Sequence, residues 1–511
     1  MKIPKYLRRE IAFFLLLSLL LIGNLSAQES NQSEESDQKG SGAKTESLHV
    51  KDTSIVKFKD LSLSIQKHSF LISAFENESN SAKAGKERTS KHWHPKIYLE
   101  GRSYTTNDPA LNFFSKLGQR DARQADFSTK SARSQVSNFL DTNNQPYTTL
   151  NSQTANILAP DTLNYPGANT YQKGTLGVDL AIYEGGAKNN IAESYDHISK
   201  GKNLEKQSVI LSEYSSTASL YAQLIYLDEY KKQISEVEKQ LQSVLRNYQV
   251  GGKGNPVGYS GLLGLKSLKN RLEGMRLEVD TQESSIRSYL TTMTDEFGNT
   301  WSIDLEPINI FLDSHLPKPS DNSKKPVEAS TLSFQTLAMK EYAESASLAA
   351  RAEKAKFLPK VGAFGESNLY NGSRNTATAY NLGFYVQMNL YNADDIGAYE
   401  EAKLKAQAQR ERVQDTIRKE SAKRKELLTM EKTFQKQLIL LANTSNLMEE
   451  QISNAKRMFA NGSINAMQLA EIFSRSTDII VQNANTNREY ILIRSELYTL
   501  FSNSISVNEG K

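Results

Sequence analysis

Residues 175–186 read TLGVDLAIYEGG, and along this stretch apolar side chains alternate with polar or small ones. Residues 383–394 read GFYVQMNLYNAD and repeat the alternation. Successive side chains of a β-strand point to opposite faces, so each stretch predicts a strand with one apolar and one polar face. The apolar positions are Leu176, Val178, Leu180, Ile182, Phe384, Val386, Met388 and Leu390. Such strands belong either to a membrane barrel with lipid outside and water inside, or to a half-buried soluble sheet.

The two stretches are parts of a longer internal repeat. A Pro-containing start of a less regular strand precedes each of them, WHPKI at residues 93–97 and FLPKV at residues 357–361. The apolar positions of the first of these strands are Ile97 and Leu99. A long helical run follows each stretch and is interrupted at YQVG, residues 248–251, or at FANG, residues 459–462. Three matches in the same order indicate that a unit of strands and long helices has been duplicated.

Beyond each alternating strand the spacing of apolar residues changes to steps of three and four. Residues 227–248 and 265–279 follow this spacing in the first copy, and residues 434–459 and 490–500 follow it in the second. The spacing is typical of coiled-coil seams. The run from Ala187 to Tyr248 contains no Pro and one Gly, so as a helix it would extend about 90 Å.

The N-terminus predicts export. Residues 1–27 combine basic residues, an apolar stretch and a small-residue pair, which is the layout of a cleaved signal peptide. Removing them lowers the formal net charge from +4 to +1, because they carry four basic groups and one acid, and this balance excludes a nucleic-acid footprint. The chain has no Cys, so disulfides, thiolate metal sites and a lipidated cysteine are excluded.

Composition divides the rest of the chain. Residues 28–60 are rich in Ser, Glu, Lys and Gly and predict a flexible leader. The first repeat is expected over residues 61–305, as helix, strand, long outer loop, strand and long helical hairpin. A Pro-rich linker at 306–330 separates it from the second repeat at 331–503. Residues 504–511 form a C-terminal tail.

The order of these elements, twice over, resembles the TolC-like outer-membrane efflux and type I secretion proteins. The resemblance covers nearly all of the mature chain, and its carriers are the strand starts at Pro95 and Pro359, the junctions LAIYEGGAKNN and MNLYNADDIGAYEEA, and the tips YQVGGKGNPVG and FANGSINAMQLAEI. It implies a homotrimer whose chains build a twelve-stranded membrane β-barrel and a long α-helical coiled-coil barrel, two tandem repeats per chain. The barrel would lie in the outer-membrane lipid and the helical tunnel in the periplasm.

The resemblance implies a passive exit duct that exports small toxic compounds or proteins, together with a periplasmic adaptor protein and an inner-membrane transporter. In the family, the helix-turn tips carry acidic residues that line the closed entrance. Here the tips contain Gly251 and Gly462, and the positions after Gly462 hold Gln468 and Glu471, whereas no acid follows Gly251. Glu471 is therefore either one ring of three acids at the entrance or an ordinary solvated glutamate.

The first loop, residues 105–173, is about 55 residues longer than its counterpart at 371–381. It is expected outside the cell, where it would act as a plug, an antigenic surface or an inert insertion. Surface loops tolerate length at small free-energy cost, which favours the inert insertion.

No sequence feature favours an enzyme. The phosphate-binding, zinc-protease and serine-hydrolase motifs are absent, and no cofactor or metal is expected. His92 and His94 flank Trp93, and they form either a metal site or, as we interpret them, an aromatic cluster at a membrane interface. The alternative to a channel is a periplasmic or surface coiled-coil scaffold or adhesin, in which the alternating strands belong to a small soluble sheet.

Overall fold

The computed structural model describes residues 54–127, 161–248, 256–294, 301–319 and 332–505. The chain divides into two units, Met1–Thr53 and Ser54–Lys511, and every described residue belongs to the second unit. The expected signal peptide at 1–27, Gly251 and most of the tail at 504–511 lie outside the described residues.

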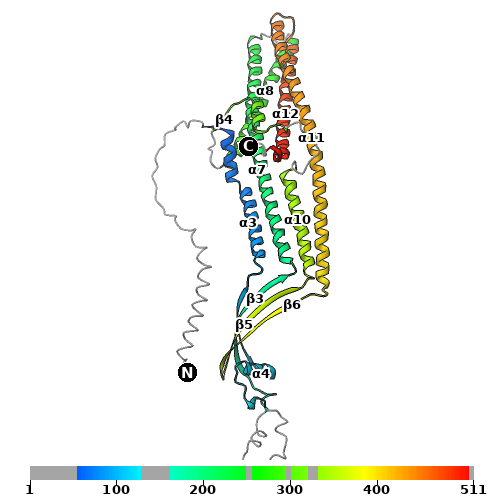
Figure 1. Cartoon of the computed structure of the whole chain (residues 1–511). Coiled ribbons are helices and arrows are strands. Elements are labelled where there is room, and N and C mark those ends of the chain that lie inside the picture. The colour runs from blue at the N-terminus through cyan, green and yellow to red at the C-terminus, as the bar shows by residue number, and fades with distance from the viewer. Residues whose placement is uncertain (1–53, 128–160, 249–255, 295–300, 320–331, 506–511) are drawn as a thin grey trace, which may run out of the picture. The chain divides into compact units, whose positions relative to one another are not determined.

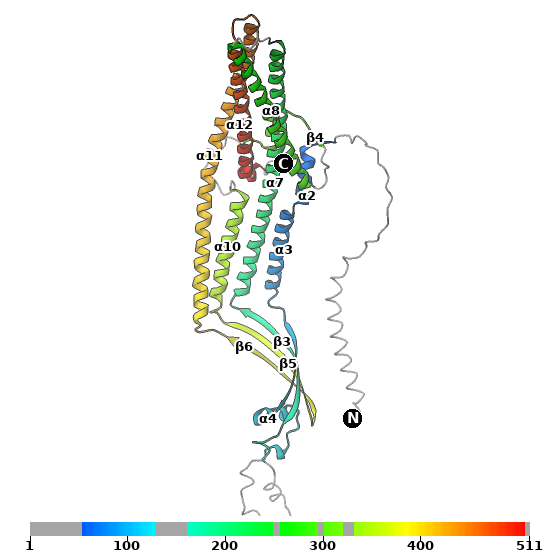
Figure 2. The same cartoon turned by 180° about the vertical axis from the view of Figure 1, so that it is seen from behind.

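Long helices form most of the second unit, and α3, α7, α10 and α11 lie side by side in both views (Figures 1 and 2). The helices are α2 Phe58–His68, α3 Phe70–Ser90, α4 Pro109–Gly118, α7 Ala187–Asn247, α8 Pro256–Thr294, α9 Ile308–His315, α10 Phe334–Ala355, α11 Ala393–Ala460 and α12 Ala466–Ile505, with a short 3₁₀ helix η1 at Gln124–Phe127. The extent of α7, 61 residues, confirms the long helix expected from residue 187 onward. No helix within the described ranges has an apolar stretch that would carry it across a bilayer.

The predicted seams are buried where α7, α8, α11 and α12 pack together. Ile234 and Leu241 of α7 and Leu265 and Leu272 of α8 are fully buried in one apolar cluster. Each fully buried side chain of this size stabilises the fold by about 1.5–3 kcal/mol, so the seam fixes how the helices are paired. The ring centroids of Tyr248 and Phe459, equivalent residues of the two tips, lie 5.5 Å apart. The two hairpins therefore end at the same level.

Four antiparallel strands form a sheet in the order β2-β3-β5-β6, at the opposite end of the helices from the hairpin tips (Figure 1). The strands are β2 Lys96–Thr106, β3 Asn169–Glu184, β5 Lys360–Gly372 and β6 Thr376–Gln387. Each repeat supplies two neighbouring strands, and β3 pairs with β5 to join the repeats.

The prediction that Met388 and Leu390 lie in a strand is wrong. Strand β6 ends at Gln387, which is opposite Lys360, the first residue of β5. Pro359 precedes Lys360 and has no backbone N–H to donate, so β5 offers no partner for the residues after Gln387. Met388 and Leu390 follow the strand and are exposed.

The connection from strand to long helix is made by different residues in the two repeats. Gly185 and Gly186 connect β3 to α7, both with positive φ, a conformation that glycine adopts without steric cost. In the second repeat, Asn392 caps α11 by accepting a hydrogen bond from the backbone N–H of Asp394 at 3.2 Å. Asp394 and Asp395 in the first turn complement the helix dipole.

A second apolar core lies beside the middle of α7. It contains residues from the ends of the expected leader and linker, which are therefore shorter than predicted. Strand β1, Ser54–Val56, pairs in parallel with β4, Trp301–Ile303, although the leader was expected to reach residue 60. Helix α9 lies within the expected linker, and its Phe311 is fully buried. The ring of Phe311 stacks on that of Tyr221 of α7, with centroids 5.2 Å apart. This apolar contact holds α9 against α7.

Candidate functional site

The register of the sheet places most of the expected apolar positions on one face. Ile97 lies opposite Val178, and Leu99 lies opposite Leu176. Leu180, Ala363 and Phe384 form another row across three strands, and Val386 lies opposite Val361. Ile182 lies at a β-bulge between Ala181 and Tyr183, and its side chain is exposed.

The apolar face is open to its surroundings in the single chain. The exposed fractions of Ile97 and Leu99 are both 69%, and those of Phe384 and Val386 are 83% and 72%. Val178, Leu176 and Ile182 are also exposed, whereas Leu180 is half-buried. Contiguous apolar surface of this kind marks a place where a protein meets lipid or another protein.

The opposite face is polar and connected by hydrogen bonds between the repeats. The Tyr98 hydroxyl donates to the Glu366 carboxylate at 2.9 Å, and the Thr175 hydroxyl donates to the Asn368 amide oxygen at 2.7 Å. Tyr385 reaches Asp179 at 3.3 Å. Asp179 and Tyr385 occupy polar positions of the two alternating stretches, whereas Tyr98, Glu366 and Asn368 lie in the less regular strands and were not predicted. Only the strand register shows which of these side chains meet.

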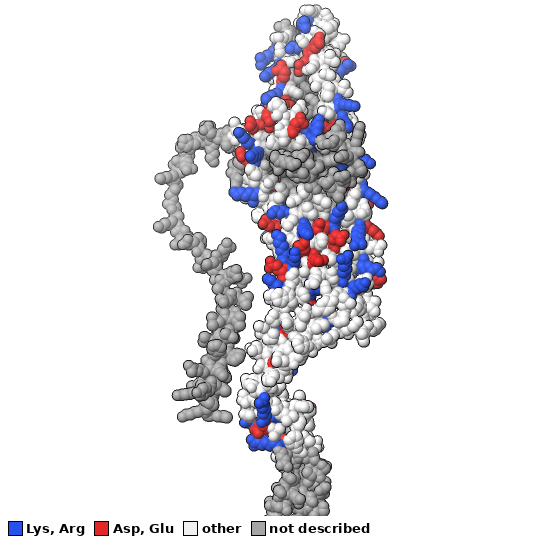
Figure 3. Space-filling model, viewed as in Figure 1, with Lys and Arg blue, Asp and Glu red and all other residues white. Residues whose placement is uncertain are grey.

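Figure 3 shows few charged side chains over the sheet in this view, between the charged surface of the helices and a charged group near α4. A charge-poor band between two charged zones is the distribution of a surface that crosses hydrocarbon.

Both edges of the sheet are open. Strands β2 and β6 are at its two ends, and neither has a second partner strand within the described part of the chain. Unpaired backbone groups along an edge strand pair readily with another strand. The sheet is therefore an incomplete element that a second chain can extend.

At the opposite end of the helices, the turn between α11 and α12 contains two of the predicted residues. Gly462 has a φ of +75°, which the turn requires and glycine permits. Gln468 forms a reciprocal cap with Asn465, because each side-chain oxygen accepts a hydrogen bond from the other residue's backbone N–H, at 2.9 and 3.0 Å. These two residues shape the turn.

Glu471, the third predicted residue of this tip, is exposed and paired with a cation on its own helix. One guanidinium nitrogen of Arg475 lies 2.6 Å from its carboxylate, and both side chains are about two-thirds exposed. Exposed pairs one helical turn apart are weak, typically about 0.3–0.5 kcal/mol. Glu471 is therefore available to a cation that competes with Arg475.

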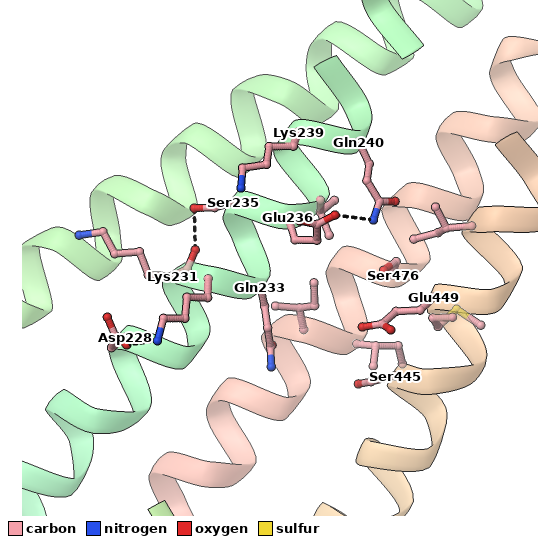
Figure 4. Close-up of a pocket in the computed structure, with 16 residues that line it drawn as sticks. Asp228, Lys231, Gln233, Ser235, Glu236, Lys239, Gln240, Ser445, Glu449 and Ser476 are labelled. Atoms are coloured by element: carbon pink, nitrogen blue, oxygen red, sulfur yellow. Dashed lines mark hydrogen bonds and ion pairs between the residues drawn. The ribbon is translucent and has the colours of Figure 1, made fainter. Parts of the chain in front are cut away.

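A groove of about 580 Å³ lies between α7, α11 and α12, some distance from the tip. Figure 4 shows Gln233, Glu236 and Gln240 of α7 facing Ser445 and Glu449 of α11. The Gln240 amide bonds to Glu236 of its own helix at 3.1 Å. No His or Cys is among the described residues that line the groove.

Within the described ranges, no group of three or more His, Cys, Asp or Glu side chains is arranged to hold a metal ion. Trp93 is exposed just before β2, with its ring centroid 4.3 Å from that of His94. This position, at the end of the sheet nearest the helices, agrees with the aromatic-cluster interpretation of the two histidines.

Comparison with solved structures identifies the fold. No family model and no curated protein matches the sequence. Crystal structures of CusC superpose with a TM-score of 0.62 at 11% identity, over 89% of this chain and 95% of theirs. The MtrE outer-membrane channel of Neisseria gonorrhoeae gives 0.62 at 12% identity, over 87% and 88% of the two chains. The CmeC outer-membrane channel of Campylobacter jejuni gives 0.61 at 12%, over 93% and 97%. The chain therefore has the fold of the TolC-like outer-membrane channels.

Proposed function

We propose that the protein is the outer-membrane exit duct of an export system and works as a homotrimer. The observation that carries this proposal is the sheet, whose apolar face is exposed, whose polar face is hydrogen-bonded, and whose two edges are open. A bilayer tolerates no open sheet edge, because unpaired backbone groups find no water there. Pairing β6 of each copy with β2 of the next would close three sheets of four strands into one twelve-stranded barrel.

The helices support the same trimer. Helix α11 lies at one side of the helical layer, while α3 and α8 lie toward the other (Figure 1). Large apolar side chains are exposed on both sides. They are Leu404, Ile439, Leu440 and Leu447 of α11, and Phe70, Leu71 and Leu277 of α3 and α8. A rotation about a three-fold axis would bring these two sides together and bury them.

The duct would be passive and take its energy from elsewhere. We infer that the hairpin tips face the periplasm and dock on an adaptor protein, which connects them to an inner-membrane transporter. The exported substrate is a small toxic compound or a protein, carried through the polar lumen of the barrel. An exposed apolar face on the sheet argues against the alternative of a soluble scaffold or adhesin, because water would destabilise it.

Reconstitution of the purified full chain in planar bilayers tests this function. We expect trimers and discrete conductance steps, and we expect the protein to stay in the outer-membrane fraction after carbonate extraction. Release by carbonate together with the absence of conductance steps would contradict the duct and favour the scaffold.

The tip offers a prediction of its own. If three Glu471 carboxylates line the entrance, Glu471→Gln weakens channel block by multivalent cations, whereas Arg475→Gln strengthens it by removing the competing cation. We expect changes of roughly two- to tenfold in the blocking concentration, larger at low salt because exposed charges are screened. Single-channel recordings with a trivalent cation measure the block. An unchanged block in both variants would place cation selectivity elsewhere in the tunnel.

A further inference from the structure

Residues 108–127 of the long first loop fold onto the sheet. They contain α4 and η1 and lie at the end of the sheet away from the long helices (Figures 1 and 2). Asp108 caps α4 by accepting a hydrogen bond from the Leu111 backbone N–H at 2.9 Å, and Pro109 begins the helix. This part of the loop therefore has regular secondary structure with a defined helix start.

Helix α4 is attached to the polar face of the sheet. The Tyr171 hydroxyl donates to the Asn112 amide oxygen at 2.7 Å, and the hydroxyls of Tyr104 and Ser115 lie 2.8 Å apart. Tyr104 and Tyr171 are directly opposite each other in β2 and β3. Alternation along the strands puts both on the same face as Tyr98 and its hydrogen bond to Glu366.

A buried ion group fastens the same segment to the second repeat. Asp126 accepts two hydrogen bonds from the Arg374 guanidinium, at 2.6 and 2.8 Å, and one from the Lys116 ammonium at 3.0 Å. The Asp126 side chain is 5% exposed and that of Lys116 is 10% exposed. Hydrogen bonds from Arg374 above all hold the pKa of Asp126 well below its usual value, so the carboxylate stays charged. Arg374 lies in the turn between β5 and β6, so the anchor joins the long loop of one repeat to the short turn of the other.

The orientation of α4 is the reverse of an ordinary surface helix. Its polar residues Asn112, Ser115 and Lys116 are buried toward the sheet, while Leu111, Phe114 and Leu117 are 42–66% exposed. The spacing of three places the apolar residues together on one side of the helix. A large apolar side that faces away from the chain's own sheet marks a contact surface for something else.

We propose that residues 108–127 form a constriction at the outer mouth of the lumen, in which the apolar sides of α4 from three copies meet near the three-fold axis. This inference rests on the proposed trimeric duct, in which the polar face of the sheet lines the lumen. A three-fold axis through the lumen necessarily brings the second and third copies to this place. Each contributes the same apolar surface, so all three cover one another.

The dimensions of the barrel support the contact. Twelve strands about 4.8 Å apart and tilted by about 40° enclose a barrel about 24 Å across between backbones. Three parallel helices, each about 10 Å thick, fit only within a circle of about 22 Å. Side chains of the polar face take up part of the barrel width of about 24 Å, so three α4 helices attached to the inner wall could not occupy the mouth without contacting one another.

The absence of Cys from the sequence allows a direct test by cross-linking the full-length trimer. We expect Phe114→Cys to form a disulfide between two copies on oxidation, seen as a covalent dimer on a non-reducing denaturing gel. Leu382→Cys is the matched control, because Leu382 is 78% exposed, against 66% for Phe114, but lies on the apolar face of the sheet and would face lipid. A Phe114→Cys trimer that forms no more covalent dimer than the control would overturn the constriction.

Conductance gives the second measurement. Arg374→Ala removes the bidentate anchor and is expected to raise single-channel conductance at least about twofold, since an apolar constriction limits ion flow. Arg102→Ala removes an exposed cation from the same face of the sheet and is expected to leave conductance near that of the unmodified chain. Equal conductance of the Arg374→Ala variant and the unmodified chain would overturn the constriction and leave the duct standing. Absence of conductance from the unmodified chain would overturn both.

Discussion

The Phe384→Arg substitution is expected to abolish the assembled channel in the outer membrane. Phe384 is 83% exposed on the apolar face of β6, in the row that contains Leu180 and Ala363. An arginine facing lipid on a barrel strand costs about 2–4 kcal/mol at the bilayer midplane and less toward the interfaces. A cost of about 1–2 kcal/mol per copy at an intermediate depth adds up to about 3–6 kcal/mol over the trimer, a large part of the roughly 5–15 kcal/mol that is typical of a whole protein. Loss of the trimer band from outer-membrane fractions on unheated gels is the measurement.

Asn381→Arg is the matched control for this experiment. Asn381 lies three residues before Phe384 on the same strand, in the row of Glu366 on the polar face. An added cation there would face water and a carboxylate, so we expect normal amounts of trimer. If both variants assembled equally well, the apolar face would not face lipid and the barrel would be wrong.

Arg494→Ala is expected to lower the free energy of unfolding by about 3–5 kcal/mol, because each buried acceptor left without a donor costs about 1–3 kcal/mol and Arg494 donates to several. Arg494 is 1% exposed. Its guanidinium donates to the backbone oxygens of Leu316 at 2.6 Å and Leu312 at 3.1 Å, and to the Tyr490 hydroxyl at 3.0 Å. Alanine would leave a cavity and unpaired carbonyls at the end of α9. Urea unfolding of the detergent-purified protein, followed by circular dichroism, measures the loss.

Asp313→Asn separates the buried contacts of Arg494 from its ion pair. Asp313 lies 2.9 Å from the guanidinium, but its own side chain is 67% exposed. Removing an exposed partner changes stability by about 0–1 kcal/mol, so this variant is expected to unfold near the urea midpoint of the unmodified chain. A large loss in Asp313→Asn, or none in Arg494→Ala, would show that the carbonyl contacts do not hold α9.

Features that depend on local periodicity were predictable from the sequence. The buried seam of α7 follows the three-and-four spacing from Leu227 onward, and the opposite faces of β3 follow the alternation of residues 175–181, up to the bulge. In both cases the side-chain period of the element sets which residues share a face, and the period is visible in a short window. Duplication then predicted the second set of elements from the first.

Features that depend on a distant partner were not predictable in this way. The end of β6 is set by the start of β5 after Pro359, and β1 exists because β4 lies beside it. Helix α9 was hidden in a Pro-rich segment, although Phe311 and Leu312 inside it are buried. The contact of Asp126 with Arg374 joins two loops that no local pattern relates.

The parallel pairing of β1 with β4 orders the steps by which the chain folds. Ser54 aligns with Trp301, and nearly the whole first repeat lies between them. Closing so long a loop is slow and unfavourable until the intervening elements have formed. Strand β1 can therefore pair only after β4, at the end of the first repeat, is available. An exported chain would cross the inner membrane with β1 still unpaired. Completion of that repeat, rather than emergence of the N-terminus, begins the folding of this core.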